Sequence, residues 1–359
     1  MTTSDYGTTA LFSPDQPGPR VGQVGAGGCA DHGKDGAYLT SGAPVTGSFL
    51  VESFGLINYT GSRHDAIAQM VRVGSSGCGF EQPLASAVRA LSNGQGNGFR
   101  RIDANLLVLV VTDEDDCSIR DPAMFSGAES VLGPLDSFRC TRFGITCDEP
   151  IDTLGEKHGC HARIDSPYIE DVSLLVDQIA KSAIDPSQLA VGVIAGTPEP
   201  VVVEQRSSPG GGSPIAALQH SCSSNGGGTI AADPGVRLLD ATQQLGSHGA
   251  FESICSANLR PALTGLARMA SQMFGVACLD STKLLDVSLE PGIQPACTAV
   301  EIRDGNVNDL PQCPADGDCF DIISDFVACA MPGERLRFVV NYVVPPTART
   351  YIRARCEVR

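Results

Sequence analysis

Hydrophobic positions first recur at helical intervals near residue 60. Ser62 and Asp65 have the spacing of a helix capping box, and the apolar residues Ile67, Met70 and Val71 follow. The sequence therefore predicts a helix that begins after Ser62 and buries these three side chains on one face.

A second helical pattern begins at Pro83, a residue favoured in the first turn of a helix. Leu84, Ala87, Val88 and Leu91 stand at i, i+3, i+4 and i+7, which places them on one face. The letters SNGQGNG that follow are typical of a loop, so the predicted helix ends there.

Continuous apolar runs then alternate with further helical patterns. Leu106–Val111 and Gln188–Gly196 are such runs, typical of parallel strands that are covered on both faces. His248–Cys255 is a predicted last strand. The helix between the two runs is expected to follow a Ser166 cap with Pro167 in its first turn. The expected apolar helix faces are Val172, Leu175, Val176 and Ile179 in that helix, and Leu259, Leu263, Leu266 and Met273 in the last one.

This order of helices and strands indicates crossover connections and a parallel sheet. After Cys278 the pattern changes to strand-like segments separated by cysteine-bearing loops. We therefore expect an α/β fold with a doubly wound, mostly parallel sheet in residues 1–279. Residues 280–359 are expected to form a small, disulfide-bonded, β-rich extension.

Fourteen cysteines restrict the class of protein further. None stands in a C-x-x-C pair, and the closest two are Cys313 and Cys319, so disulfides are favoured over zinc modules. Disulfides persist outside the reducing cytosol, which predicts an exported protein in the extracellular space, the periplasm or on the outer cell surface. The opening letters MTTSDYGTTALF lack the pattern of a signal peptide, so we expect a segment upstream of Met1. No segment has the length and apolarity of a transmembrane helix.

The apolar run that ends at Val111 leads through Thr112 into four consecutive acids. The net charge of −16 argues against a nucleic acid or an anionic membrane as partner. Acids at the carboxyl edge of a parallel sheet lie where open α/β folds place their ligands, and carboxylates suit calcium or magnesium. Asp113, Asp115 and Asp116 are therefore candidate metal ligands. The alternative is a solvated acidic loop held by a disulfide from Cys117.

Other candidate chemistry is weaker. His158, Cys160 and His161 have the residue types of a soft metal site, but without a second cluster a disulfide-bonded loop with surface histidines is favoured. The nucleophile motif G-x-S-x-G and a phosphate-binding glycine loop are both absent from the sequence. These observations favour a non-enzyme, and no residue is assigned a catalytic role.

Three phrases carry a family resemblance: GCGFEQPL, VTDEDDCS and SIC. With the predicted fold, they resemble the von Willebrand factor A domain, in particular exported, cysteine-rich bacterial proteins of that kind. The resemblance implies a metal-ion-dependent adhesion site in which Asp113 falls on the last ligand. Cys78 would stand near the family's threonine ligand, and the Asp-x-Ser-x-Ser ligands occur nowhere in this chain. The resemblance therefore implies that the family's first strand and main ligand loop lie upstream of Met1, and that the strand at Leu106–Val111 borders a gap.

The expected topology also suggests disulfide pairs. Cys78 and Cys117 are expected on neighbouring loops of one sheet edge, which makes them a favoured pair. A second expected bond ties the long glycine- and serine-rich loop to the last strand, and a third closes the excursion after residue 117. The expected pairs are Cys78–Cys117, Cys222–Cys255, and either Cys140–Cys147 or Cys140–Cys160.

The leading functional hypothesis is an exported binding or adhesion protein that recognises a protein or glycan partner through the carboxyl edge of the sheet, with possible assistance from calcium or magnesium. Long loops on a rigid scaffold are common recognition elements. One alternative is a metal-dependent hydrolase that uses Asp113, Asp115 and Asp116 to activate water. A further alternative is a structural component of the cell envelope.

Overall fold

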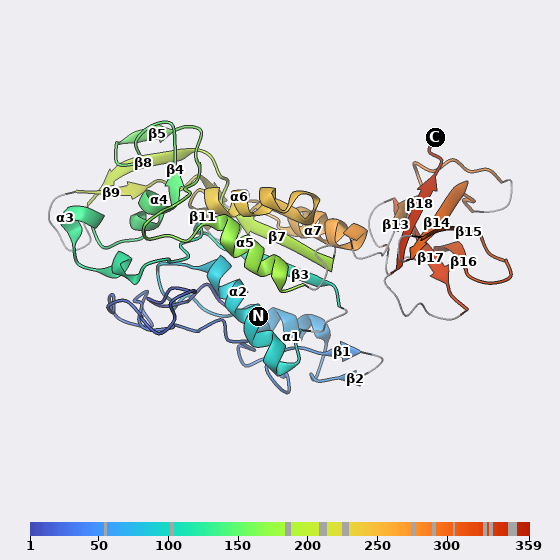
Figure 1. The fold of residues 1–359 in the computed structure, drawn as a ribbon, viewed down its shortest axis with the longest axis horizontal. Helices are drawn as coiled ribbons and strands as arrows, with labels where there is room; N and C mark the ends of the chain where they lie inside the picture. Colours follow the sequence, from blue (N-terminus) through green and yellow to red (C-terminus); the bar gives the residue numbers. More distant parts are fainter. Residues whose placement is uncertain are drawn as a thin grey trace. The chain divides into compact units, whose positions relative to one another are not determined.

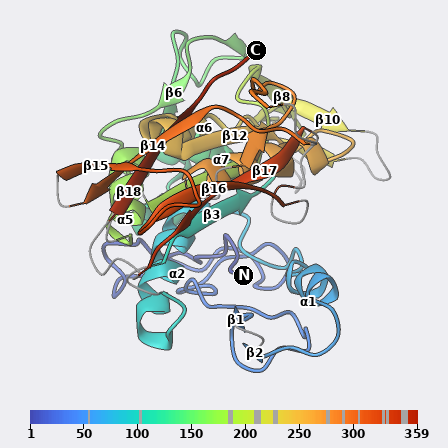
Figure 2. The ribbon, with the colours of Figure 1, turned by 90° about the vertical axis from the view of Figure 1, so that its right-hand side faces the viewer.

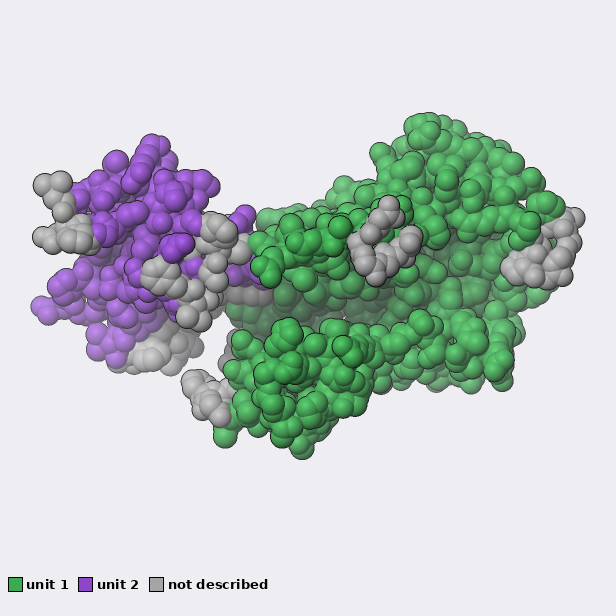
Figure 3. Space-filling view, turned by 180° about the vertical axis from the view of Figure 1, so that it is seen from behind, with its two compact units in different colours: residues 1–266 green, residues 267–359 purple. Residues whose placement is uncertain are grey.

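The computed structural model describes the chain except for residues 54–55, 101–103, 184–187, 208–213, 225–229, 274–277, 289–291, 304–305, 326–328, 330–332 and 344–349. The chain forms two compact units, residues 1–266 and residues 267–359 (Figure 3). The boundary expected after residue 279 falls inside the second unit.

The first unit is mixed α/β and contains a three-stranded parallel sheet (Figure 1). Its strands are β3 (Leu106–Val111), β7 (Leu189–Ala195) and β12 (Gly249–Ser253), in the order β12–β7–β3. Strands β3 and β7 coincide with the two predicted apolar runs, and β12 lies within the predicted last strand. All pairings are parallel, as the alternation of helices and strands predicted. The central strand β7 is buried along its whole length.

Three helices cover one face of this sheet and form the main core. They are α2 (Pro83–Asn97), α5 (Val172–Lys181) and α6 (Val236–Gln244). Figures 1 and 2 both place α2 beside β3. The four apolar positions predicted for each of α2 and α5 are all buried in one cluster with side chains of β3, β7 and α6. Helical periodicity therefore identified the core-facing stripes of these two helices.

The opposite face of the sheet is covered less completely. Helix α7 (Arg260–Met273) contributes Leu266, which is 3% exposed and packs over Gly192. A Cβ atom at Gly192 would lie 3.0 Å from both terminal methyl carbons of Leu266, so this glycine permits the close approach. Leu263, also expected to face inward, is exposed, while the side chain of Met273 lies outside the described residues.

Strand β3 is buried on one face only. Leu106 and Val110 lie in the core, whereas Leu107, Leu109 and Val111 are 43%, 44% and 54% exposed. The expectation that this strand is covered on both faces is therefore wrong. A continuous apolar run is compatible with burial, but the sequence pattern of β3 does not fix how many helices reach it.

Two helix predictions require correction. Ser62 caps α1 (Arg63–Met70) by accepting a hydrogen bond from the Asp65 backbone N–H at 3.0 Å, as predicted, yet Ile67 and Val71 are exposed. This helix buries Ala66 and Met70, one turn apart, instead.

Helix α5 begins at Val172 rather than just after Ser166. The Ser166 hydroxyl does accept a backbone hydrogen bond, from Ile169 at 3.2 Å, but it closes a turn. Ile169 forms an antiparallel β-bridge with Ile119. The chain around Ile169 is therefore extended, and the helix begins only after Asp171.

The remaining elements of the first unit are short and surround the sheet. An antiparallel sheet of order β5–β8–β9 packs on a small core that includes Phe138, Ile145 and Val201. The elements are β1 (Glu52–Ser53), β2 (Leu56–Ile57), a 3₁₀ helix η1 (Pro122–Phe125), α3 (Glu129–Leu132), α4 (Phe138–Gly144), β4 (Ile145–Thr146), β5 (Gly155–Lys157), β6 (His161–Ala162), β8 (Val201–Arg206), β9 (Ile215–Leu218), β10 (Cys222–Ser224), β11 (Ile230–Ala232) and a 3₁₀ helix η3 (Gly246–His248).

The second unit consists mainly of antiparallel strands, as the sequence pattern predicted. Two three-stranded sheets, of order β13–β17–β16 and β15–β14–β18, enclose a core with stacked Phe320 and Phe338 rings, 4.9 Å between centroids. The strands are β13 (Cys278–Asp280), β14 (Cys297–Arg303), β15 (Asn306–Leu310), β16 (Cys319–Ser324), β17 (Glu334–Asn341) and β18 (Thr350–Cys356).

All fourteen cysteines form disulfides, which fits a protein that folds in an oxidising, extracytoplasmic compartment. Cys222–Cys255 is present as expected. The expected Cys78–Cys117 pair is wrong, and so is a bond from Cys140 to Cys147 or Cys160. The bonds are Cys29–Cys78, Cys117–Cys140, Cys147–Cys160, Cys222–Cys255, Cys278–Cys329, Cys297–Cys356 and Cys313–Cys319.

The N-terminal loop is the reason for the corrected pairing. Val21 and Cys29 form a bridge, and Gly27 bridges directly to Cys78, so the loop brings Cys29 next to Cys78. Cys117 is then left to bond Cys140 of the following excursion. Within the described residues, no helix combines the length and apolarity needed to cross a membrane.

Peptide mapping distinguishes the two disulfide patterns. Lysines and arginines separate Cys29, Cys78, Cys117 and Cys140 in the sequence, so trypsin places them on different peptides. Mass spectrometry of the unreduced protein should recover the linked pairs Cys29–Cys78 and Cys117–Cys140. Recovery of a Cys78–Cys117 peptide from freshly exported protein would contradict the structure.

Candidate functional site

The acidic segment that follows β3 occupies the carboxyl edge of the parallel sheet. The Thr112 backbone N–H donates to the Ile194 carbonyl at 3.1 Å, and the Asp113 carbonyl then accepts from the Asp233 N–H at 2.8 Å. Beyond Asp113 the chain turns inward, so the four acids meet different surroundings. Asp113 is exposed, Glu114 is partly buried, and Asp116 is fully buried.

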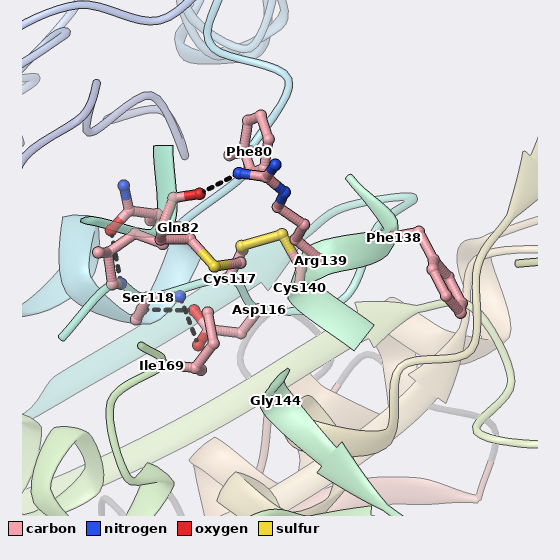
Figure 4. The surroundings of a disulfide bond; sticks show 12 residues. Phe80, Gln82, Asp116, Cys117, Ser118, Phe138, Arg139, Cys140, Gly144 and Ile169 are labelled. Carbon is pink, nitrogen blue, oxygen red and sulfur yellow. Dashed lines mark hydrogen bonds between the residues drawn. A yellow bond between two sulfur atoms is a disulfide. The ribbon is translucent and has the colours of Figure 1, made fainter. Parts of the chain in front are cut away.

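Asp116 caps the N-terminus of α2. Its Oδ1 accepts from the Leu84 backbone N–H at 3.0 Å and from the Ser118 hydroxyl at 2.7 Å (Figure 4). The Ser118 hydroxyl in turn accepts from the Ala85 N–H at 3.0 Å. Because the first N–H groups of a helix lack partners within the helix, a buried carboxylate there is stabilised by hydrogen bonds and by the helix dipole.

Arg237 of α6 neutralises Asp116 inside the protein. Its Nη2 lies 3.0 Å from Asp116 Oδ2, and the two side chains are 1% and 0% exposed. The guanidinium also donates to the carbonyls of Asp116 at 2.8 Å, Glu170 at 2.9 Å and Gly144 at 3.2 Å. A buried charge is tolerated only when it is paired and its donors are satisfied, and Arg237 meets both conditions.

Asp115 performs the same capping role at α6. Its two carboxylate oxygens accept from the backbone N–H groups of Arg237 at 3.0 Å and Leu238 at 3.1 Å. Burial raises the pKa of Asp115 to about 7, although the hydrogen bond from the Arg237 backbone favours the charged form. Asp115 and Asp116 therefore tie one loop to the N-termini of two helices.

These roles bear on the metal site expected from the sequence. Of Asp113, Asp115 and Asp116, the latter two already accept N–H and O–H donors with their carboxylate oxygens. In the part of the chain that the structure describes, no three His, Cys, Asp or Glu side chains are grouped to hold a metal ion. The calcium or magnesium site remains a prediction from the sequence, without a ligand set in this geometry.

The acids left at the surface form a second cluster with neighbours from other segments. Glu81 accepts a hydrogen bond from the Thr112 hydroxyl at 2.8 Å, and His220 Nδ1 lies 2.7 Å from Asp233 Oδ1. Burial, with repulsion from Glu81, Asp233 and Asp113, raises the pKa of Glu114 to about 8. Burial also raises the pKa values of Glu81 and Asp233.

A polar cavity of about 530 Å³ adjoins this cluster. His220 lines it, together with Arg206 and Glu204, whose side chains form an ion pair 2.7 Å long. The cavity is therefore lined by a carboxylate and a guanidinium from β8 and by the imidazole of His220, which connects it to Asp233 of the acidic cluster. This arrangement suits recognition of a charged polar group.

The excursion after Cys117 is fixed to the same edge by a disulfide and a buried arginine. Cys117 is bonded to Cys140, and the neighbouring Arg139 is 1% exposed (Figure 4). Burial lowers the pKa of Arg139, and its guanidinium is surrounded by backbone carbonyls. The carbonyls that accept from it belong to Met124, Ser126, Gly133 and Pro134. Arg139, at the start of α4, thus connects this helix to the ends of η1 and α3.

Neither buried arginine was identified from the sequence. A weak signal existed for Arg237, which stands between the apolar residues Val236 and Leu238 at the start of a helical pattern. For Arg139 the sequence gives no signal, because its partners are carbonyl groups of a loop whose course only the folded structure defines.

The loop that contains His158 and His161 is a disulfide-bonded surface loop, which was the interpretation favoured over a metal site. Cys160 is bonded to Cys147, and His158 is exposed with its Nδ1 2.8 Å from Glu149 Oε1. Hydrogen bonding to Glu149 raises the pKa of His158. His161 contacts the Gly159 carbonyl, so the two histidines do not converge.

Comparisons of this chain with protein-family models, curated proteins and solved structures found no match.

Asp116→Asn tests the buried ion pair. The change keeps the shape of the side chain but leaves Arg237 without its counter-charge, so we expect the free energy of unfolding to fall by about 3–5 kcal/mol. Asp113→Asn is the matched control, since Asp113 is exposed, and should change stability by less than about 0.5 kcal/mol. Denaturant unfolding of the three proteins measures both. Equal stabilities would show that Arg237 does not need Asp116.

The raised carboxyl pKa values predict a stability that decreases with pH. Glu114, with a pKa of about 8 in the folded protein, is protonated at acidic pH in both states, and ionises less readily in the folded state. Its contribution is therefore complete below about pH 4.5 and is lost as pH rises through 8. The melting temperature should decrease from pH 5 to pH 8.5, and Glu114→Gln should reduce that decrease. Asp177→Asn, on the exposed side of α5, should leave it unchanged; an unaltered slope in Glu114→Gln would contradict the prediction.

Proposed function

We propose that this protein is an exported binding protein that recognises a polypeptide partner with cationic side chains through the carboxyl edge of its parallel sheet. The observation that carries the proposal is the division of the acids. Asp115 and Asp116 are used inside the fold, whereas Asp113 is exposed and the partly buried Glu114 and Asp233 lie beside it. Surface carboxylates that the fold does not use are available to a partner.

The electrostatics of this edge favour a cation as the recognised group. Burial raises the pKa of Glu114, and repulsion from the neighbouring carboxylates raises it further. A bound lysine or arginine relieves the repulsion and favours the charged form of Glu114. The chain as a whole carries a net charge of −16, which attracts cationic partners over a distance and repels anionic ones.

The scaffold also supports a recognition role. Four disulfides lie in the first unit, and Cys117–Cys140 and Cys222–Cys255 brace the loops on either side of the acidic cluster. Loops fixed in this way bind with less loss of conformational entropy. The parallel sheet, with acids after one of its strands, is in keeping with the proposed likeness to von Willebrand factor A domains, whose doubly wound fold binds partners at the same edge.

Selection from a library of random displayed peptides tests this proposal. The wild-type protein should enrich peptides that contain lysine or arginine, and salt should weaken their binding. The double variant Asp113→Asn/Glu114→Gln should bind the selected peptides at least about tenfold more weakly, which corresponds to 1.4 kcal/mol.

A second double variant, Glu129→Gln/Asp177→Asn, controls for the loss of overall negative charge, because it removes two exposed acids elsewhere in the first unit. It removes the same formal charge and should bind the peptides within about twofold of wild type. Enriched peptides without a cationic bias, or equal weakening in both double variants, would count against recognition at the carboxyl edge.

A further inference from the structure

Strand β3 is the outer strand of the parallel sheet. It pairs with β7, and among the described residues no strand pairs with its other side (Figure 1). Its six residues, LLVLVV, include no charge, proline or glycine. Natural proteins usually protect such an edge with lysines, prolines or bulges, because its free backbone groups pair readily with another strand.

The register identifies which backbone groups of β3 are free. The Thr112 N–H donates to Ile194 of β7, and in a parallel ladder the residues that bond a given neighbour alternate along the strand. Leu106, Val108 and Val110 therefore bond β7, as Thr112 does. The N–H and C=O groups of residues 107, 109 and 111 point to the open side, where no described residue bonds them.

The same three residues expose their side chains. Leu107, Leu109 and Val111 are each exposed by more than two fifths, and α7 reaches only part of this row. The Leu109 methyl group approaches Gly192, over which Leu266 packs, while Val111 at the end of the row is the most exposed of the three. Strand β3 thus combines free backbone N–H and C=O groups along its open side with a row of exposed apolar side chains.

We propose that the open side of β3 binds a single extended polypeptide strand, supplied by a partner chain, as a fourth strand of the sheet. The free N–H and C=O groups require an occupant with the same repeat of donors and acceptors, which an extended backbone has and a lipid or glycan lacks. The apolar row selects aliphatic side chains at alternate positions of that strand.

Charge decides between a foreign strand and a second copy of this chain. Strand β3 ends next to Asp113 and Glu114, so a bound strand is favoured if basic residues flank its apolar part. A second copy has no charge within its β3 and carries the same net charge of −16, which opposes self-association. This surface is distinct from the acidic carboxyl edge, and its recognition depends on backbone hydrogen bonds rather than on Asp113 or Glu114 alone.

The test uses a fluorescent peptide in which valine and threonine alternate between terminal lysines. It should bind the full-length protein, as measured by fluorescence anisotropy. The same peptide with N-methyl groups on its central residues keeps its charges and side chains but lacks the N–H donors. It should bind at least about tenfold more weakly, because its central residues can no longer donate hydrogen bonds to the carbonyl groups on the open side of β3.

A variant of β3 tests the contribution of the protein's own N–H groups. Leu107→Pro removes an N–H that faces the open side and no bond to β7, which is the position where an edge strand accepts proline. It should bind the unmethylated peptide about tenfold more weakly, while the matched control Leu107→Thr retains the N–H and should bind like wild type. Circular dichroism and melting establish that each variant is folded. If Leu107→Pro does not fold, the methylated peptide alone decides.

Four outcomes would overturn the proposal. The first is no binding of the peptide, and the second is equal binding of the methylated and unmethylated peptides. The third is a dimer in sedimentation experiments without peptide that is lost in Leu107→Pro, which would assign the edge to a second copy. The fourth is loss of peptide binding when the chain is extended upstream of Met1, which would assign the edge to a strand of the protein itself. Because Asp113→Asn/Glu114→Gln leaves the N–H groups of β3 intact, preference for the unmethylated peptide should persist in that variant even if recognition at the carboxyl edge fails.

Discussion

The buried ion pair between Arg237 and Asp116 is the interaction on which the first unit depends. Isolated charges are costly inside a protein, so each must be paired and hydrogen-bonded. Asp116 meets this requirement at the N-terminus of α2, and Arg237 meets it with three carbonyl groups besides the carboxylate. One pair thereby fixes α6, α2, the loop after β3 and the chain at Gly144 relative to one another.

The same requirement explains how one acidic run serves two purposes. Two helices begin beside the end of β3, and their unpaired N–H groups stabilise two carboxylates, those of Asp115 and Asp116. Among the described residues, no helix N-terminus or arginine pairs with the carboxylates of Asp113 and Glu114, and the pKa of Glu114 is raised by burial and by repulsion from the nearby acids. The inner pair provides rigidity, and the outer pair provides the electrostatic character on which the proposed recognition depends.

Helices and strands were predicted best where the local pattern of apolar residues is enough to determine the structure. The core stripes of α2 and α5 follow from helical periodicity, because a helix that buries one face must repeat its apolar residues at helical intervals. Strands β3 and β7 follow from their continuous apolar runs. The predictions were wrong where burial depends on a second element. Ile67, Leu107 and Leu109 are apolar at suitable positions, yet no described helix or strand covers them fully.

The sequence by itself determined the α/β class of the first unit, the β-rich second unit, the complete use of cysteine in disulfides and the place of the acids after a buried strand. These features depend on local pattern and on composition. The tertiary structure alone decided that Cys29 bonds Cys78, that Arg139 is held by carbonyl groups, and which of the four acids face inward. The physical reason is that pairing and desolvation depend on distances between segments far apart in the chain, such as the 121 residues between Asp116 and Arg237.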